Sequence, residues 1–264
     1  MQAQRQKNAI IVPSGAKGGF VIHKERVSKE EFSQVYATYI HALLDMVDNV
    51  NMQEVRIVNL SGGSTPRALY ALLASPAYRD LTDWSRWHVY FGDERCVPQD
   101  HPDSNFRMAR ETLLDHVPIP RHHVHPMVVA PADPDAAARA YEALLRSEVT
   151  GEDGIPVLDL ALLGLGEDGH TASLFPGTPI LQERERLVAP VYVERLASWR
   201  VSLTYPMLDA ARHLLFLAAG EGKRPVLDDL RNAPTQTAYP VQGLAPQGTV
   251  EWYLDRAAAG GEQA

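Results

Sequence analysis

The sequence predicts an α/β fold with a mostly parallel sheet, helices on both faces of that sheet and doubly wound connectivity. Two observations lead to this fold class. Apolar segments of strand length alternate along the chain with amphipathic segments of helix length. Three of the strand-length segments end in glycine-rich or charged motifs. Because ligands bind beyond the carboxyl ends of the strands in open α/β sheets, the same three motifs predict one functional site.

The first half of the chain contains a short strand followed by alternating helices and strands. The first strand is expected over Gly19–Lys24, and the helix after it begins at Ser28, where Glu31 completes a capping box. Apolar residues at helical spacing continue this helix from Phe32 to Val47. The next elements are expected in the order strand Val55–Leu60, helix Pro66–Leu73, strand Trp87–Phe91 and helix Ser104–Asp115. Proline suits the first position of a helix, which favours a start at Pro66.

The second half repeats the alternation. We expect a helix over Asp135–Val149, then strands at Val157–Leu165, Leu187–Val193, Arg200–Thr204 and His213–Ala219, with short helices at Pro206–Arg212 and Gly222–Arg231. The prolines between residues 118 and 134 indicate a long surface loop and not a domain boundary. The chain is therefore expected to form a single domain over residues 1–264, with flexible ends at 1–18 and 259–264.

Composition narrows the class of protein. Of the 264 residues, 45% are hydrophobic and 22% are charged, close to the globular average, which excludes a disordered or collagen-like chain. The single cysteine, Cys96, cannot form an internal disulfide. A net charge of −8 disfavours non-specific nucleic-acid binding, although a few local cations suffice for an anionic substrate. The polar segment Met1–Lys7 lacks a signal-peptide core and no run is long enough to span a membrane, so a soluble cytoplasmic protein is expected.

The first motif is Ser61-Gly62-Gly63-Ser64-Thr65-Pro66, between a strand and a helix. Its glycines let the backbone approach an anion closely, the free N–H groups of a helix start favour negative charge, and the two hydroxyls of Ser64 and Thr65 add donors. No lysine follows the second glycine, which excludes a Walker-type nucleotide loop. The motif is interpreted either as a phosphate cradle or as an ordinary tight turn with a Ser or Thr cap.

The second motif is Gly92-Asp93-Glu94-Arg95, which places two acids and a base at a strand end. Acids at this place can orient a histidine or bind sugar hydroxyls, and Arg95 can pair with one of them. The alternative is a solvated run of charges that ends a strand. The neighbouring Cys96 has no base nearby in the sequence, and is interpreted as a small buried apolar residue and not as a nucleophile.

The third motif, Gly164–Gly169, matches the G-x-G-x-x-G pattern of dinucleotide-binding proteins. It lies past the middle of the chain, and Pro176-Gly177 interrupts the helix expected after it, which disfavours nicotinamide or flavin binding. A tight turn that presents Asp168 and His170 at a helix start fits better. A histidine titrates near neutral pH, and a helix N-terminus lowers its pKa further, so His170 is a candidate general base.

The remaining histidines do not suggest a metal site. They gather in the proline-rich part of the chain at His101, His116, His122, His123 and His125. Their spacing lacks the i, i+4 form of a zincin pair, and a structural zinc site would need cysteines that the chain does not have. No metal is assigned.

Taken together, the three motifs resemble those of the 6-phosphogluconolactonases in order and spacing. The match includes Ser104-Asn105 after the second motif and Thr171–Gly177 after the third. Further matching segments are Arg200–Thr204, Gly220–Lys223 and Val250–Asp255, so that the resemblance spans about Gly19 to Ala258. It implies a Rossmann-like fold shared with glucosamine-6-phosphate isomerases, ribose-5-phosphate isomerases and CoA transferases.

The resemblance also implies an activity. This is the hydrolysis of 6-phospho-D-glucono-1,5-lactone to 6-phospho-D-gluconate, the second step of the oxidative pentose phosphate pathway, without a metal or an organic cofactor. The expected partner is this small phosphosugar lactone, with no nucleic acid and no membrane, and the expected state is a monomer or a small homo-oligomer.

Roles for the candidate residues follow from the resemblance and the chemistry of lactone hydrolysis. His170 is the expected general base, oriented by Asp168 or Asp93. Backbone amides of the Gly166–His170 turn, with Gly166 and Gly169 foremost, are candidates for holding the developing oxyanion. The phosphate is expected on four residues of the first motif and two cations, namely Gly62, Gly63, Ser64, Thr65, Arg200 and Lys223. Without the resemblance, Arg200 and Lys223 would be interpreted as members of surface ion pairs.

One segment departs from the family pattern, and two alternative functions remain. The departing segment is Val193–Trp199, where lactonases usually carry a Lys-Pro-Pro stretch. The first alternative is a deaminase or isomerase. The related glucosamine-6-phosphate deaminases use a glutamate at the position where this chain has Phe175, so this chain lacks an acid that the deaminase reaction needs. A non-catalytic phosphosugar-binding module is the second alternative, disfavoured because Asp93, Asp168 and His170 are all present.

Overall fold

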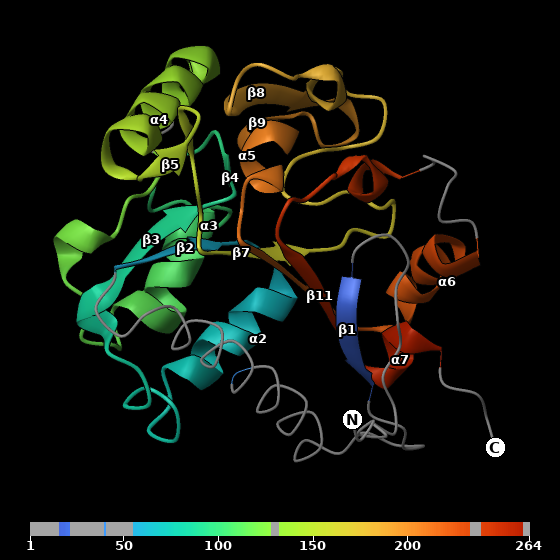
Figure 1. Ribbon diagram of the computed structural model, residues 1–264, viewed down its shortest axis with the longest axis horizontal. Coiled ribbons are helices and arrows are strands. Elements are labelled where there is room, and N and C mark those ends of the chain that lie inside the picture. Colours follow the sequence, from blue (N-terminus) through green and yellow to red (C-terminus); the bar gives the residue numbers. More distant parts are fainter. Residues whose placement is uncertain (1–15, 22–39, 41–54, 128–131, 233–238, 261–264) are drawn as a thin grey trace.

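A six-stranded sheet forms the centre of the protein in the computed structural model, which describes residues 16–21, 40, 55–127, 132–232 and 239–260 (Figure 1). Its strand order is β1-β11-β10-β7-β2-β3, and every neighbouring pair is parallel. The strands are β1 (Ala16–Val21), β2 (Arg56–Leu60), β3 (Trp87–Phe91), β7 (Leu160–Gly164), β10 (His213–Ala218) and β11 (Thr249–Leu254). The predicted fold class, a mostly parallel α/β sheet, is confirmed.

A second, antiparallel sheet of three strands lies over one face of the central sheet. Its order is β4-β9-β8, with β4 at Asp93–Arg95, β9 at Ser198–Leu203 and β8 at Val188–Val193. The sequence predicted β8 and β9 as strands but did not separate them from the central sheet, and it placed the residues of β4 at the end of the preceding strand instead of in a strand of their own. A strand of three residues is too short to show an alternating pattern. A two-residue hairpin, β5 (Gly151–Glu152) and β6 (Ile155–Pro156), was also missed.

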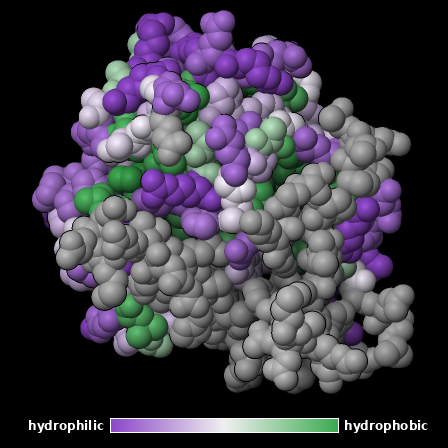
Figure 2. All heavy atoms as spheres, in the orientation of Figure 1, coloured by the Kyte–Doolittle hydropathy of each residue, from purple (hydrophilic) through white to green (hydrophobic). Residues whose placement is uncertain are grey.

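Helices cover both faces of the central sheet (Figure 1). One face carries α2 (Ser64–Leu73) and α3 (Asn105–Ala109), which continues as a π-helical turn over Arg110–Leu114. On the other face, α4 (Pro134–Glu148) and α5 (Tyr205–Asp209) accompany the second sheet, and α4 presents a hydrophilic outer surface (Figure 2). The helices α6 (Arg224–Asn232) and α7 (Arg256–Ala259) lie at the β1 end of the sheet.

Short 3-10 helices join these elements. They are η1 (Trp84–Arg86), η3 (Arg121–His123), η4 (Pro179–Gln182), η5 (Glu194–Leu196), η6 (Glu221–Lys223) and η7 (Pro240–Gly243). Two of them, η5 and η6, carry charged residues that are important for the site described below. In the described part of the chain, no helix is long and apolar enough to cross a membrane.

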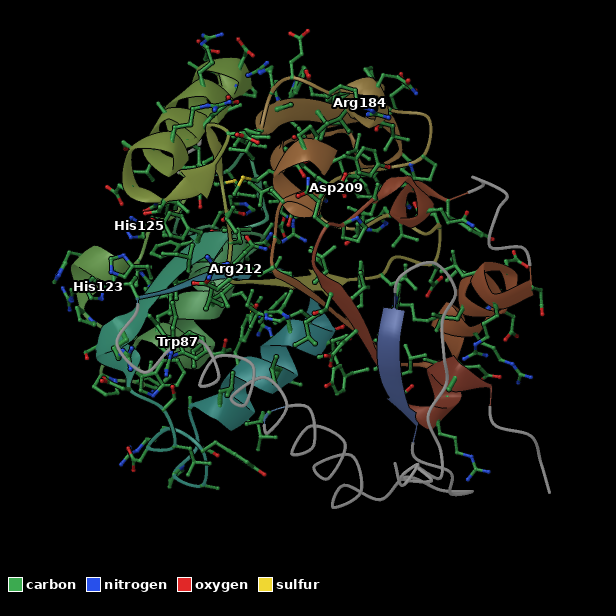
Figure 3. All side chains as sticks on the ribbon, in the orientation of Figure 1. Trp87, His123, His125, Arg184, Asp209 and Arg212 are labelled. Carbon is green, nitrogen blue, oxygen red and sulfur yellow. The ribbon has the colours of Figure 1, made fainter. Side chains whose placement is uncertain are left out.

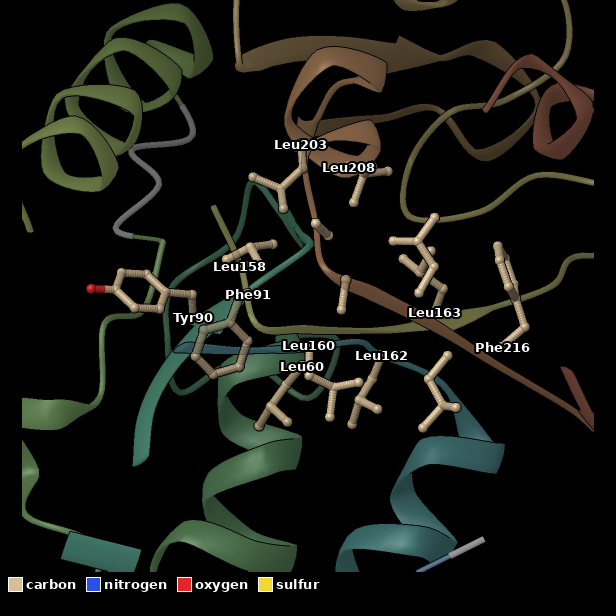
Figure 4. Close-up of a cluster of buried hydrophobic side chains, with 14 of the residues drawn as sticks. Leu60, Tyr90, Phe91, Leu158, Leu160, Leu162, Leu163, Leu203, Leu208 and Phe216 are labelled. Atoms are coloured by element: carbon tan, nitrogen blue, oxygen red, sulfur yellow. The ribbon is translucent and has the colours of Figure 1, made fainter. Parts of the chain in front are cut away.

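The core lies on both faces of the central strands, as expected for a parallel sheet that is covered on both sides. Leucines of β7 pack between the two layers (Figure 4). Phe216 of β10 stacks on Trp252 of β11 with ring centroids 4.1 Å apart. Leu60, Phe91 and Leu163 close the same cluster near the carboxyl ends of their strands and are at most 1% exposed. The apolar packing thus holds the strand ends in fixed positions.

Three further differences separate the predicted elements from the structure. The helix α2 begins at Ser64, two residues before the expected start at Pro66. The strand β11 and the helix α7 had no counterpart in the predicted element order. The helix expected after Gly169 does not form: Ala172 and Gly177 have φ of 47° and 75°, which an α-helix cannot accommodate, and the next helical turn is η4.

The two chain ends bear on the expected flexible segments. The strand β1 begins at Ala16, so residues 16–18 belong to it although they were expected in the flexible N-terminal end. Ala259, expected in the flexible C-terminal end, is the last residue of α7 and is buried. The helix predicted from Ser28 to Val47 lies outside the described residues apart from Ile40, as does the end of the predicted first strand at residues 22–24.

Candidate active site

A cavity of about 390 Å³ opens at the carboxyl ends of β2, β7 and β10, and all three sequence motifs contribute to its lining. Nine of the predicted site residues line it, namely Gly62, Gly63, Ser64, Thr65, Asp93, Gly166, His170, Arg200 and Lys223. The other two predicted residues do not line it. Asp168 contacts Nδ1 of His170, and Gly169 packs against Tyr239. The convergence of strand ends expected from the sequence therefore produces one site of a size suited to a small ligand.

The N-terminus of α2 forms one wall of the candidate cavity. Gly63 is the N-cap residue, with φ of 112°, a value that favours glycine, and it makes no side-chain capping hydrogen bond. The first turn of the helix carries no acidic residue. Backbone N–H groups of a helix start without a carboxylate cap attract an anion through their partial positive charge. This wall fits a phosphate group.

Two cations predicted for the phosphate reach the same cavity from other elements. The Arg200 side chain on β9 is 11% exposed, and its nearest carboxylate oxygen is Asp93 Oδ2, 3.7 Å from Nη1. The Nε atom of Arg200 is buried without a hydrogen-bond partner. Burial lowers the pKa of Arg200 from its ordinary value, which still leaves it charged at neutral pH. Lys223 extends from η6. A nearly buried guanidinium with one distant counter-ion is a strong site for a further anion.

Asp93 is placed to hold other groups of the cavity and not the imidazole. Its Oδ1 accepts a hydrogen bond from Asn105 Nδ2 (3.1 Å), and its Oδ2 accepts one from Ser173 Oγ (2.6 Å). Among the hydrogen bonds of the described residues, none joins Asp93 to His170. Of the two acids expected to orient His170, Asp168 is the one that contacts the imidazole, and Asp93 is the buried carboxylate next to Arg200.

His170, which lines the cavity, forms a close pair with Asp168. The distance from His170 Nδ1 to Asp168 Oδ1 is 2.5 Å, and the imidazole stacks on the ring of Phe175 with centroids 4.0 Å apart. Because a carboxylate can only accept, Nδ1 carries the proton and Nε2 keeps its lone pair, and His170 is one of the residues that line the cavity. Burial lowers the pKa of His170 below 6.5, while the hydrogen bond and the charge of Asp168 oppose that shift. The pair presents a neutral base at physiological pH.

Two expectations about the turn that carries this pair are wrong. His170 does not begin a helix, so its lowered pKa comes from burial and not from a helix N-terminus. The Gly166 N–H donates to the carbonyl of His170 (2.8 Å), and the Gly169 N–H donates to the carbonyl of Gly166 (3.0 Å). These two amides close the turn on itself, and neither has a hydrogen left to hold an oxyanion.

The glycine at position 166 has a steric reason instead. A Cβ atom there would lie 2.0 Å from His170 Nδ1 and 2.5 Å from Asp168 Oδ1. Gly166 thus makes room for the His170–Asp168 pair to form across the turn. Gly166, the second glycine of the G-x-G-x-x-G pattern, thus allows the close approach of two side chains.

The structure adds Arg95 and Asn105 to the lining of the cavity. Arg95 Nη1 donates to Asn105 Oδ1 (2.7 Å), and the Glu94 carboxylate accepts from the backbone N–H groups of Asn105 and Phe106 (2.8 and 2.9 Å). Glu94 therefore helps to cap α3 and fixes Asn105. The sequence places Ser104-Asn105 in the family match, but nothing in the sequence shows that Glu94 reaches across ten residues to their helix.

A substitution at Gly62 tests how tightly this wall is built. A Cβ at position 62 would lie 1.9 Å from Asn105 Oδ1, and Asn105 is held by Asp93 and Arg95. We expect Gly62→Ala to displace Asn105, to lower the free energy of unfolding by about 1–3 kcal/mol, and to lower kcat/KM by about tenfold or more. Calorimetry and steady-state kinetics measure the two effects. Gly164→Ala, whose added methyl meets no atom within 4 Å, is the control for thermal stability. Equal Tm values for the two variants would contradict the argument.

Three of the clustered histidines, His122, His123 and His125, pack at the β3 edge of the sheet, whereas His101 and His116 contact Asp103 and Glu111. His88 of β3 stacks on His123 (centroids 3.9 Å), and His125 Nδ1 lies 3.0 Å from Glu148 Oε2, on the outer side of β3 (Figure 3). Burial, together with the neighbouring imidazoles of His123 and His125, lowers the pKa of His88 to about 4. Over the ranges that the structure describes, no group of three or more His, Cys, Asp or Glu side chains is arranged to hold a metal ion.

Comparisons with known proteins agree with the geometry. The model of the family described as glucosamine-6-phosphate isomerases/6-phosphogluconolactonase matches residues 28–252. A 6-phosphogluconolactonase from Synechocystis sp. is 44% identical over 205 residues, which cover 76% of this chain and 82% of the relative.

Solved structures extend the likeness to the fold. The 6-phosphogluconolactonase of Trypanosoma brucei superposes with a TM-score of 0.79 at 30% identity, covering 91% of this chain and 97% of the other. A monomeric glucosamine-6-phosphate deaminase superposes with a TM-score of 0.73, covering 92% of this chain and 99% of the other. At 18% identity, the deaminase shares the fold alone.

Proposed function

The chain belongs to the family of glucosamine-6-phosphate isomerases and 6-phosphogluconolactonases, and we propose that it is a 6-phosphogluconolactonase with His170 as its general base. The reaction is the hydrolysis of 6-phospho-D-glucono-1,5-lactone to 6-phospho-D-gluconate. One arrangement carries the proposal: the imidazole of His170, held through Nδ1 by Asp168, lines the same cavity as the uncapped N-terminus of α2. The base and the phosphate cradle thus face one ligand.

The chemistry follows from the tautomer. His170 Nε2 takes a proton from the water that attacks C1 of the lactone, and a C–O bond forms as the carbonyl electrons move to oxygen. The same nitrogen returns the proton to the ring oxygen as the bond between C1 and that oxygen breaks. Asp168 stabilises the imidazolium between the two steps. General acid–base help of this kind typically contributes about 10²–10⁴ in rate.

The phosphate anchors the substrate for this chemistry. The N-terminus of α2 with Gly62, Gly63, Ser64 and Thr65 receives the phosphate, and Arg200 and Lys223 neutralise its charge. Arginine can bind a phosphate in two-point geometry, whereas lysine acts as a point charge. Binding energy at the phosphate is then used to hold C1 near His170.

The deaminase alternative receives no support from the geometry. Phe175, at the position where a deaminase carries a glutamate, is 2% exposed and stacks on His170. An apolar ring at this place cannot relay protons during ring opening. It desolvates the imidazole instead, which fits a neutral base.

Loss of lactone, followed against the spontaneous background, is the experiment that tests the function. We expect 6-phosphogluconate to form well above the blank, with the same rate in the presence of a chelator, and no ammonia release from glucosamine 6-phosphate. A rate equal to the blank, or deamination of the amino sugar, would overturn the proposal. The blank is essential because the lactone hydrolyses spontaneously.

The pH dependence follows from the direction of the His170 pKa. His170 must be neutral to act as a base, so activity is lost as pH falls through its pKa. Since burial lowers that pKa from 6.5, the acid limb of kcat/KM for the free enzyme lies below pH 6.5. A pH series corrected for the spontaneous reaction measures it. An acid limb with its midpoint at or above 6.5 would contradict the assignment.

A further inference from the structure

Arg195 reaches the catalytic pair from the segment that departs from the family pattern. It lies on η5, the turn between β8 and β9, and Ala197 ends that turn with φ of 45°. Arg195 Nη2 donates to Asp168 Oδ2 at 2.6 Å. The guanidinium carbon also lies 5.0 Å from the centroid of the Phe175 ring, on which His170 stacks. Arg195 does not line the cavity itself.

The two oxygens of Asp168 therefore have separate partners. Oδ1 faces His170 Nδ1, and Oδ2 accepts from Arg195. A carboxylate held at both oxygens cannot rotate, and rotation would take Oδ1 away from the imidazole. We infer that Arg195 is a positioning residue of the proposed lactonase: it holds Asp168 in the orientation that fixes the tautomer and the angle of His170. This inference rests on the proposed function of His170.

The charges around His170 define what Arg195 adds. Asp168 from the same turn and Asp93 from β4 favour the protonated imidazole, and Arg195 disfavours it. Arg200 also lies near the Phe175 ring, with its guanidinium carbon 5.4 Å from the centroid, and Arg95, Glu167 and Lys223 line the same cavity. Among the described residues, Arg195 is the arginine that forms an ion pair with Asp168. Its removal leaves the negative charges of Asp168 and Asp93 less well balanced near His170. Its removal raises the pKa of His170.

The Arg195 side chain is 57% exposed, and ion pairs of exposed side chains usually contribute little to stability. If Arg195 only stabilised the fold, its removal would leave the pKa of His170 unchanged. The test is Arg195→Gln, with Arg195→Lys as the conservative variant and Arg184→Gln as the matched control. Arg184 is a second exposed arginine that lies above the ring of Tyr205 in the upper part of the molecule, and its loss removes the same charge (Figure 3).

Two readouts separate the inference from the proposed function. The first is the titration of the His170 imidazole in the full chain, followed by NMR without substrate. The second is the pH profile of kcat and KM for the lactone. We expect Arg195→Gln to move both the titration and the acid limb to higher pH, to lower kcat at neutral pH by up to about tenfold, and to leave KM within about twofold. Arg195→Lys should restore most of the wild-type profile, and Arg184→Gln should match the wild type.

Each outcome has one meaning. An Arg195→Gln protein with the wild-type titration and pH profile overturns the positioning role, even if the wild type is an active lactonase. A shift of equal size in Arg184→Gln also overturns it, because the effect would then come from net charge. A wild type without lactonase activity overturns the proposed function, and the NMR titration still decides whether Arg195 acts on His170.

Discussion

Replacing His170 with alanine should lower kcat for the phosphorylated lactone by about 10²–10⁴, to a rate near the spontaneous background. The proposed general base is the His170 imidazole, which pairs with Asp168 through Nδ1 and is the one histidine in the described lining of the cavity. KM should change little, because the phosphate contacts remain. Steady-state kinetics with subtraction of the uncatalysed rate measures both quantities.

His170→Asn separates the loss of a base from the loss of packing. The asparagine amide can still donate to Asp168, but it cannot accept and return a proton at neutral pH. Both variants should therefore be inactive with little change in Tm. His116→Ala removes an exposed imidazole far along the chain and serves as the control. Turnover near the wild-type value in either His170 variant would rule out the general-base role.

Arg200→Ala should raise KM for the phosphorylated lactone by about 10–100-fold, because one charge-assisted hydrogen bond to phosphate contributes about 1.5–3 kcal/mol. The same substitution should change kcat/KM for unphosphorylated gluconolactone by less than about threefold, since that substrate has no anion for Arg200 to bind. The comparison of the two substrates isolates the phosphate contact from any general damage to the cavity.

Removing Arg200 also leaves Asp93 buried without its counter-ion, so stability must be measured beside activity. Arg200→Lys keeps the charge and should lie between the wild type and Arg200→Ala in KM. Arg212→Ala breaks another Arg–Asp pair, from Arg212 Nη1 to Asp159 Oδ1 (2.9 Å), at the opposite end of β10 (Figure 3). Arg212→Ala should leave kcat/KM unchanged for both lactones. An equal loss of kcat/KM for the two lactones in Arg200→Ala would contradict a phosphate role for Arg200.

The convergence of the motifs could be predicted because parallel strands end at one edge of a sheet. Gly62 follows β2 and Gly166 follows β7, and these strands are neighbours in the sheet. Hydrophobic runs located both strands, and the glycines after them marked the site. Each strand can be located from its own hydrophobic run. The alternation of strands with helices then predicts that the strands lie parallel in one sheet.

The roles within the site could not be predicted in the same way. Asp93 lies against Arg200 because β4 pairs with β9, a contact between residues more than a hundred positions apart. The hydrogen bond between Arg195 and Asp168 likewise depends on how a hairpin folds back over a turn. The amides of Gly166 and Gly169 were assigned to an oxyanion because the sequence cannot show that the turn uses them itself. Long-range pairing decided the first two cases, and local hydrogen bonds within the turn decided the third.

The position of β9 in the middle of the second sheet has a consequence for how such enzymes can vary. Arg200 is paired with Arg95 on one side and with Val191 on the other, so two neighbouring strands fix its register. The tip at residues 194–197 projects past that ladder. A tip of another length or composition can be grafted there without moving the arginine, which fits the departure of Val193–Trp199 from the Lys-Pro-Pro stretch. In the proposed lactonase, affinity for the phosphate and the pKa of His170 could then be engineered as separable properties.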